Sequence, residues 1–213
     1  CMMTVLMHDS VSASNVRLNR TQVQIVRGDT YRLYVKGTTA KVKWYSSNAK
    51  IATVSNGKVT AKKKGTAVIY AKVNGKKYAC KVTVVTQQRA YIDTLQRQIN
   101  IQRRRYGFNS YDRNPLLQRA AQKRAKELAE KFSHARPNGY SWASAISMRY
   151  NFKKASELTA RYYTDPQEVV DAWMSRASTK AKIISKRYNE IGVGVYLDED
   201  GFLYYAVIVA VRK

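Results

Sequence analysis

The 213-residue sequence predicts two domains, an all-β sandwich followed by an α-β-α sandwich. Three observations support this prediction. Apolar and polar residues alternate with a period of two over residues 16–85, as in strands that bury one face. Near Gln87 the apolar spacing changes to that of amphipathic helices. The chain then ends in two alternating segments joined by a short acidic turn, which indicates a β-hairpin.

The first domain is expected to span residues 14–86, and the second residues 87–213, with no long linker between them. Several short strands separated by turns within about 70 residues are typical of a small β-sandwich. Asn56-Gly57 and Asn74-Gly75 permit the positive φ angles of tight hairpin turns. Cys80 falls at an inward position of an alternating segment, so we expect a small core side chain there.

Three helices are predicted in the second domain. The first covers residues 89–106 and ends at Gly107, which favours a helix C-terminus. Its inward stripe consists of Tyr91, Ile92, Leu95, Ile99 and Arg103.

The second helix is expected to begin with Asn114 as its N-cap and Pro115 in its first turn. Glu127 and Lys131 have the i,i+4 spacing of an ion pair. The predicted buried face consists of Leu116, Leu117, Ala120, Ala121, Ala125, Leu128 and Phe132.

The third helix is expected to follow Asp165 as cap and Pro166 as opening residue, with Val169, Val170 and Trp173 pointing inward. The closing hairpin covers residues 190–197 and 202–211 around the turn Asp-Glu-Asp-Gly, which we interpret as a solvated turn rather than a calcium loop.

The net charge of +25 predicts attraction to polyanions. Residues 1–86 contain 16 lysines and arginines against two acids, and residues 87–213 contain 23 against 12. Candidate partners are wall teichoic acid, peptidoglycan, acidic glycans, anionic lipid head groups and nucleic acid; a cationic surface without a specific partner is the alternative. No apolar run reaches the roughly 20 residues that would make a transmembrane segment.

Residues 1–13 form an N-terminal lead with a short apolar patch followed by Ser-Val-Ser-Ala. This pattern is typical of a signal-peptide remnant cleaved near Ala13, and equally of an arbitrary chain boundary. Cys1 is also open to interpretation as a lipoprotein cysteine. Cys1 and Cys80 alone make neither a disulfide framework nor a zinc site.

The first domain resembles a bacterial immunoglobulin-like domain of group 2. The resemblance is carried by "WYSSNAKIATV" (44–54), "GKVTA" (57–61) and "GTAVI" (65–69) and covers the whole half. It implies an immunoglobulin-like sandwich of the kind that serves as a spacer or adhesive module on secreted and surface proteins of bacteria.

The second domain resembles a CAP-superfamily domain of the bacterial SCP type. The matching motifs are "LQRAAQKRAKELAEKFSHARPNG" (117–139), "ASELTA" (155–160), "DPQEVVDAWM" (165–174) and "EIGVGV" (190–195), in the order and spacing of the family. The resemblance implies the CAP/SCP fold and a cleft lined by two histidines and a glutamate, which hold a divalent metal in some members.

Carried over to this sequence, the first histidine is His134, the glutamate is Glu157, and the second histidine position is Thr179. Structural and catalytic zinc sites use at least three protein ligands, so one imidazole and one carboxylate are an incomplete set. Lys180 adds a positive charge that opposes a dication. We therefore expect no metal and no other cofactor.

Two interpretations of His134 stay open. A His134–Glu157 couple fits a general base, with the carboxylate orienting the ring, but no activated nucleophile is identifiable beside it. Alternatively, His134 stabilises the loop that contains Arg-Pro-Asn-Gly and takes no part in chemistry.

We expect a secreted or cell-surface binding protein rather than an enzyme, in which a basic immunoglobulin-like module presents the CAP/SCP domain to anionic cell-wall or host polymers. One alternative is a cleft hydrolase using His134 and Glu157. Another is a lipid-binding protein whose groove is lined by the aromatic segment 140–152. Specific nucleic-acid binding is not expected, although residues 103–105 and 62–64 are runs of three basic side chains. The sequence contains no signal for an oligomeric state.

Overall fold

The computed structural model describes residues 15–213, so the expectations for residues 1–13 and for Cys1 lie outside the described part of the chain. The chain divides into two compact units, with the boundary between Thr86 and Gln87. Each unit has its own hydrophobic core. No helix within residues 15–213 is long and apolar enough to cross a membrane.

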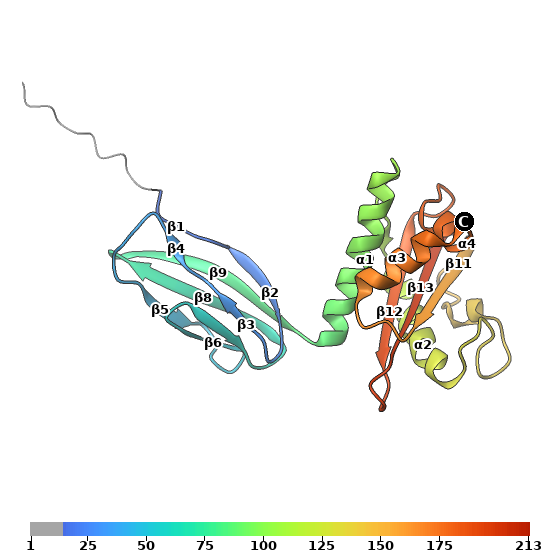
Figure 1. Ribbon diagram of the computed structural model, residues 1–213, viewed down its shortest axis with the longest axis horizontal. Coiled ribbons are helices and arrows are strands. Elements are labelled where there is room, and N and C mark those ends of the chain that lie inside the picture. The colour runs from blue at the N-terminus through green and yellow to red at the C-terminus, as the bar shows by residue number, and fades with distance from the viewer. Residues whose placement is uncertain (1–14) are drawn as a thin grey trace, which may run out of the picture. The chain divides into compact units, whose positions relative to one another are not determined.

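The first unit consists of two facing sheets, visible in Figure 1. One sheet has the strand order β2-β9-β8-β5, the other has the order β3-β7-β6, and β1 pairs with β4. The strands are β1 Arg17–Leu18, β2 Gln22–Val26, β3 Thr30–Arg32, β4 Val35–Lys36, β5 Lys43–Ser46, β6 Ala52–Ser55, β7 Lys58–Ala61, β8 Gly65–Val73 and β9 Lys76–Val85.

The inward residues of both sheets form one core, which includes Leu33, Val59, Ile69 and the fully buried Cys80. The predicted turns are confirmed, because both residues of Asn56-Gly57 and of Asn74-Gly75 have positive φ angles. These turns join β6 to β7 and β8 to β9, which are antiparallel pairs.

The second unit is a four-stranded sheet of order β10-β12-β13-β11 with helices on both faces (Figure 1). Its elements are α1 Gln87–Arg105, β10 Asp112–Arg113, α2 Pro115–Glu130, the 3-10 turn Trp142–Ala145, β11 Phe152–Arg161, α3 Pro166–Ser175, α4 Ala177–Ile183, β12 Glu190–Leu197 and β13 Leu203–Arg212.

Strand β13 shows why two helical layers are needed. It is buried on both faces, and its side chains alternate between two cores. Tyr205 and Val207 belong to the core that α1, α3 and α4 cover. Ile208 and Ala210 belong to the core that α2 covers. A strand that is apolar on both faces requires cover on both, which these helices supply.

The predicted helix starts are confirmed. The Asn114 side chain accepts hydrogen bonds from the backbone N–H groups of Leu116 (2.9 Å) and Leu117 (3.3 Å). The Asp165 side chain accepts one from the Gln167 N–H (2.8 Å). Both helices have proline in the first turn, where no N–H bond is lost.

Two local predictions for α2 are wrong. Phe132 is 39% exposed rather than buried, because the helix ends at Glu130 and the chain turns away. Glu127 pairs with Arg124 and Arg136 instead of Lys131, because Lys131 lies in extended backbone past the helix end. Strand β11 and helix α4 were not predicted as elements.

Two glycines on β12 allow α2 to lie directly against the sheet. A Cβ atom at Gly192 would lie 2.1 Å from the Leu117 backbone, and one at Gly194 would lie 2.0 Å from the Ala121 carbonyl oxygen. Only glycine fits at such distances, so these two positions fix the separation of α2 from the sheet.

We expect Gly194→Ala to lower the free energy of unfolding of the second unit by about 3 kcal/mol, because the added methyl group overpacks the contact with α2. Gly139→Ala is the control: its Cβ meets nothing within 4 Å, and it costs only about 1 kcal/mol for its positive φ. Urea unfolding of both variants measures the difference. Equal costs would contradict the close-contact explanation.

Candidate functional site

The three sequence-predicted site residues line one cavity of about 430 Å³ in the second unit. His134 comes from the segment after α2, Glu157 from β11 and Thr179 from α4. The structure therefore brings together residues that are 23 and 22 positions apart in the sequence. Trp173 of α3 is a further wall of this cavity, which we call the cleft.

His134 is held at the mouth of the cleft by the carboxylate of Glu157. The His134 Nδ1 and Glu157 Oε2 atoms are 2.6 Å apart. The Glu157 side chain is 0% exposed, whereas that of His134 is 58% exposed. A buried carboxylate thus fixes one ring nitrogen of an imidazole whose other edge is open to solvent.

The second partner of Glu157 is Arg124, which is completely buried within α2. Its Nε donates to Glu157 Oε1 (2.8 Å), its Nη1 to Glu127 Oε2 (2.8 Å) and its Nη2 to the Ser133 carbonyl (2.7 Å). Burial by itself lowers the pKa of Arg124, but the hydrogen bonds and charges of Glu157 and Glu127 outweigh this and raise the pKa. The guanidinium therefore stays charged.

Sequence reasoning missed Arg124, although a signal was present. Arg124 lies on the stripe of α2 that also contains Leu117, Ala121 and Leu128, all of them buried. An arginine in the middle of an apolar stripe indicates a buried partner, because an unpaired charge is rarely buried.

The loop that contains His134 is fixed by a second ion pair. Arg136 donates to Glu127 through Nη2 (2.7 Å) and Nε (3.1 Å), and through Nη1 to Ser144 Oγ (2.9 Å). The Trp142 N–H donates to the His134 carbonyl (3.0 Å). The segment after α2 is therefore positioned by side chains of α2 itself.

Thr179 faces the cleft but its hydroxyl is engaged with the backbone. It donates to the Trp173 carbonyl at 2.5 Å and lies 3.2 Å from the Arg176 carbonyl. This contact links the end of α3 to the start of α4. Thr179 therefore has a clear structural role at the position where the family resemblance implies a histidine.

The side chains present do not fit a divalent metal. Both Glu157 oxygens already face Arg124 and His134, and Thr179 is a neutral hydroxyl. Within residues 15–213, no three histidine, cysteine, aspartate or glutamate side chains gather closely enough to hold an ion. Zinc sites in proteins use at least three such donors.

Cations dominate the remaining lining of the cleft. Arg161, Arg176 and Lys182 line it together with His134, while its only acidic side chain is Glu157, already paired with Arg124. The Lys182 ammonium donates to the Glu157 carbonyl (3.0 Å). Arg161 lies on β11, Arg176 lies between α3 and α4, and Lys182 lies on α4. None of the three was identified as a cleft residue from the sequence.

Lys182 also lines a second hollow, of about 680 Å³. Its other charged side chains are Lys186 and Arg187, and none of the residues that line it is acidic. We call the two hollows together the cationic groove. Five cations lie along it: Arg161, Arg176, Lys182, Lys186 and Arg187.

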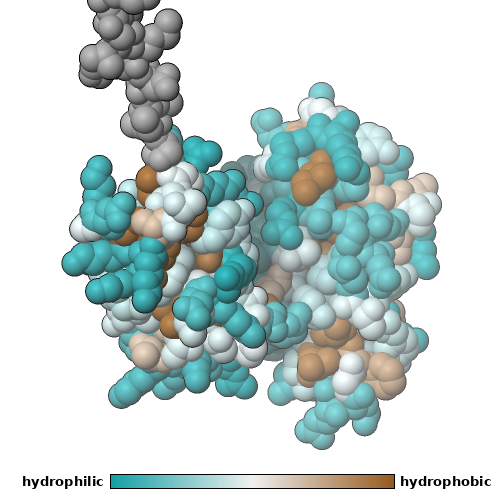
Figure 2. Space-filling view, turned by 60° about the vertical axis from the view of Figure 1, so that its left-hand side comes forward, coloured by the Kyte–Doolittle hydropathy of each residue, from teal (hydrophilic) through white to brown (hydrophobic). Residues whose placement is uncertain are grey.

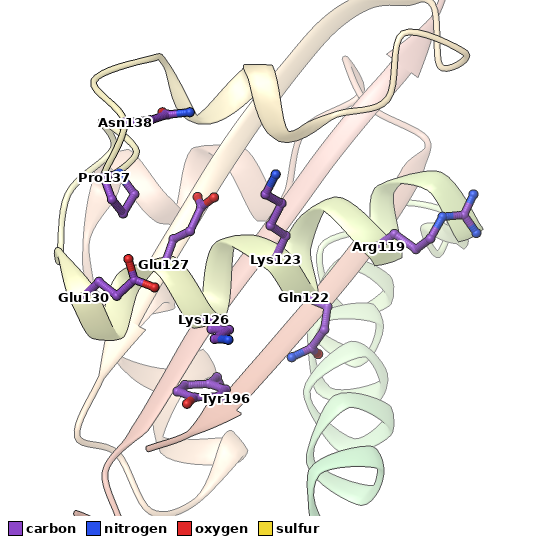
Figure 3. Close-up of a pocket in the computed structure, with 9 residues that line it drawn as sticks. All are labelled: Arg119, Gln122, Lys123, Lys126, Glu127, Glu130, Pro137, Asn138 and Tyr196. Carbon is purple, nitrogen blue, oxygen red and sulfur yellow. The ribbon is translucent and has the colours of Figure 1, made fainter. Parts of the chain in front are cut away.

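Figure 3 shows another cavity, of about 560 Å³, on the outer side of α2. In this view Glu127 and Lys123 extend toward the loop that carries Pro137 and Asn138. Its three cations are accompanied by Glu127 and Glu130, so its lining is of mixed charge. It contains none of the sequence-predicted site residues.

Two other segments noted in the sequence each contribute residues to the core. In the run 103–105, Arg103 is buried and donates to the Asn109 carbonyl (2.6 Å) and the Ile183 carbonyl (2.6 Å). In the segment 140–152, Ile146 and Tyr150 are core residues against α2 and β13. Ordinary core formation therefore accounts for much of the aromatic segment.

Comparison with known proteins identifies both halves. The model of the cysteine-rich secretory protein family (CAP) matches residues 96–210, more than half of the chain. The model of the bacterial Ig-like domain (group 2) matches residues 12–84. These matches, in this order along the chain, confirm the two resemblances inferred from the sequence motifs.

Individual proteins are also similar to this chain. The uncharacterized protein YkwD of Bacillus subtilis (strain 168) is 28% identical over 98 residues, 45% of this chain and 38% of that protein. The match therefore spans less than half of this relative's length.

Two solved structures share the fold of the second half. An outer surface protein of Borrelia burgdorferi is 22% identical with a TM-score of 0.54, covering 60% of this chain and 96% of that one. An extracellular SCP-domain protein of Bacillus anthracis is 18% identical with a TM-score of 0.52, covering 63% and 46%.

We expect Arg124→Met to lower the free energy of unfolding of the second unit by about 3–5 kcal/mol, because the buried Glu157 carboxylate loses its guanidinium partner and keeps only His134. The double variant Arg124→Met, Glu157→Leu should regain about 2 kcal/mol, because both charges are then removed. Urea unfolding measures both values. No recovery in the double variant would show that Arg124 acts mainly through its other partners.

The Glu127 contacts predict loss of stability in acid. Burial raises the pKa of Glu127, but hydrogen bonds and charges from Arg136 and Arg124 outweigh it and hold the pKa below its ordinary 4.5. A folded-state pKa below the unfolded one stabilises the fold above about pH 4.5, and this contribution is lost as the pH falls through the folded value.

The stability difference between the wild type and Glu127→Gln should therefore be about 2 kcal/mol near pH 7 and shrink toward pH 3. Urea unfolding across this range measures it. A difference that does not change with pH would contradict the assignment.

Proposed function

Because this chain belongs to the cysteine-rich secretory protein (CAP) family and contains a bacterial Ig-like unit before the CAP unit, we propose that it is an extracellular binding protein for anionic polymers of a cell wall or host surface. The CAP unit binds the polymer in the cationic groove, and the basic Ig-like unit adds a second contact. No catalytic step is required.

The observation that carries this proposal is the charge of the cationic groove. The linings of its two hollows contain five cations and one carboxylate, Glu157, whose charge is already balanced by Arg124. A concave surface of one sign concentrates ligands of the opposite sign and raises their association rate. Phosphate or carboxylate groups spaced along a polymer match such a groove.

Two relatives support a location outside the cell. One similar structure is described as an outer surface protein, and another as an extracellular protein. Secretion or surface display would place the groove where wall teichoic acid, peptidoglycan and acidic glycans occur.

We further propose that the cleft works without a metal. The family resemblance implies a metal in some members, but the donor set here is one imidazole and one carboxylate that is shared with an arginine. Arg176 and Lys182 line the same cleft and oppose a dication.

A hydrolase is the second candidate, and one observation favours it. The 2.6 Å contact between His134 and Glu157 is the geometry of an oriented general base. Of the hydroxyl side chains that line the cleft, Thr179 donates to a backbone carbonyl and is not placed as a nucleophile. Such an enzyme would have to activate water instead.

The test is a titration of the full chain with a soluble glycerol phosphate oligomer, with binding measured residue by residue through backbone amide NMR shifts. The amides of Ala172 and Thr179 report on the cleft. We expect Arg161→Gln with Arg176→Gln to weaken binding at these amides about tenfold, because two charge contacts are lost.

The matched control is Arg105→Gln with Arg149→Gln, which removes the same charge at exposed positions that do not line the groove. It should change binding at the cleft amides less than twofold. Equal weakening by both pairs would refute a specific groove. Hydrolysis of wall material that His134→Ala abolishes, with the fold intact, would establish the hydrolase instead.

A further inference from the structure

A row of three lysines crosses the outward face of the four-stranded sheet in the Ig-like unit. Lys43 on β5 is the register partner of Lys72 on β8, and Lys72 is the partner of Lys77 on β9. All three are exposed. Neighbouring strands lie about 4.8 Å apart, and like charges directly opposite each other destabilise a sheet. Such a row indicates a function other than stability.

No acid within residues 15–86 compensates the row. In residues 15–86 the only acidic side chain is Asp29. It follows β2, whose last residue Val26 pairs with Val85 at the far end of β9. Lys77 lies eight residues earlier on β9, which corresponds to about 26 Å along a strand. The lysines therefore present uncompensated charge at one end of the sheet.

Two tyrosines occupy the next cross-strand row. Tyr45 and Tyr70 are register partners with ring centroids 5.0 Å apart and planes inclined by 27°. The Lys77 ammonium lies 3.9 Å from the Tyr70 ring centroid, so it is held in place by a cation–π contact. The third residue of the row, Ala79, is small and exposed.

The polar surface continues across β9 and β2. A shallow hollow of about 310 Å³ is lined there by Gln22, Val23, Gln24, Lys81 and Thr83. Amide and hydroxyl groups beside a lysine suit a ligand that carries both hydroxyl groups and negative charge. Figure 2 shows that the surface of the Ig-like unit, on the left, is mainly hydrophilic, with hydrophobic residues in smaller groups.

We propose that the sheet face formed by Lys43, Tyr45, Tyr70, Lys72 and Lys77 binds an anionic glycan-type polymer. Its lysines contact successive phosphate or carboxylate groups, and the open side of the Tyr45 ring contacts the apolar side of a sugar or polyol unit. The site deepens the proposed function, because it assigns polymer binding to named residues of the Ig-like unit.

A carbohydrate-type polymer fits this face better than a nucleic acid does. Tyr70 is partly buried and contacts both Tyr45 and Lys77, whose ammonium lies 3.9 Å from the Tyr70 ring centroid and 5.7 Å from the Tyr45 ring centroid. In this row only the Tyr45 ring, which is 40% exposed, is open to a ligand. Single-stranded nucleic acids are bound by stacking successive bases on several aromatic rings, and this face offers one.

The test uses the full chain and the NMR titration described above, with the amides of Ala79 and Thr83 as reporters of this face. The variant is Lys43→Gln, Lys72→Gln, Lys77→Gln. The control is Lys62→Gln, Lys63→Gln, Lys64→Gln, which removes the same charge from an exposed loop between β7 and β8. Probes are teichoic acid and heparin, with single-stranded DNA for comparison.

We expect the variant of the lysine row to weaken polymer binding at the sheet amides more than tenfold. The slope of log K against the logarithm of the salt concentration should become less steep by about 2, because each of the three lost phosphate contacts contributes about 0.7. The control variant should change binding less than twofold. Equal loss in both variants would overturn the proposal, because a general positive field would then explain binding.

Tyr45→Leu separates ring contact from charge, since it leaves the net charge unchanged. We expect about fivefold weaker binding, and no change would overturn the sugar-contact part of the proposal. Preference for teichoic acid identifies a phosphodiester polymer as the ligand, and preference for heparin identifies an acidic glycan. Tighter binding of single-stranded DNA than of either polymer would overturn the proposal.

The two proposals fail in distinguishable ways. If the polymer shifts no amide signal at Ala172 and Thr179 but shifts those at Ala79 and Thr83, the proposal for the cleft fails. If it shifts no signal at Ala79 and Thr83 but shifts those at Ala172 and Thr179, the proposal for the sheet face fails. Because both sets of amides are observed in one sample, either site is tested while the other serves as an internal reference.

Discussion

The buried ion pair between Arg124 and Glu157 is the interaction on which the cleft depends. It joins α2 to β11 with both side chains 0% exposed. Removing two charges from water is costly, and good geometry with further hydrogen bonds is needed to offset that cost. Here the remaining donors and acceptors are used by Glu127, the Ser133 carbonyl and His134. One contact thus positions the helix end, the loop and the imidazole.

This pair also decides which ligands suit the cleft. A carboxylate that is shared between a guanidinium and an imidazole has little negative charge left to attract a dication. Arg161, Arg176 and Lys182 then determine the sign of the electrostatic field. The fold of the family is retained, while the cleft carries the cations to which we assign an anionic ligand. A fold does not determine a ligand, because the ligand is selected by the site.

Local signals made much of the fold predictable. The change of period near Gln87, the caps Asn114 and Asp165, and the Asn-Gly turns act over a few residues, so the sequence shows them directly. The positions of His134, Glu157 and Thr179 followed from motif order. Their contacts were not predictable, since Arg124 meets Glu157 across 33 positions and the other cations come from separate elements.

The glycines of β12 limit how far α2 can move when a ligand binds. With Leu117 and Ala121 lying directly on Gly192 and Gly194, α2 has no space to move toward the sheet. Interiors this closely packed respond to force as rigid bodies. Arg124 on α2, which holds the cleft residue Glu157, is therefore fixed relative to the sheet, and a ligand loses little free energy in repositioning that carboxylate. Differences in affinity among ligands should then arise from how long each stays bound rather than from how fast the protein adapts.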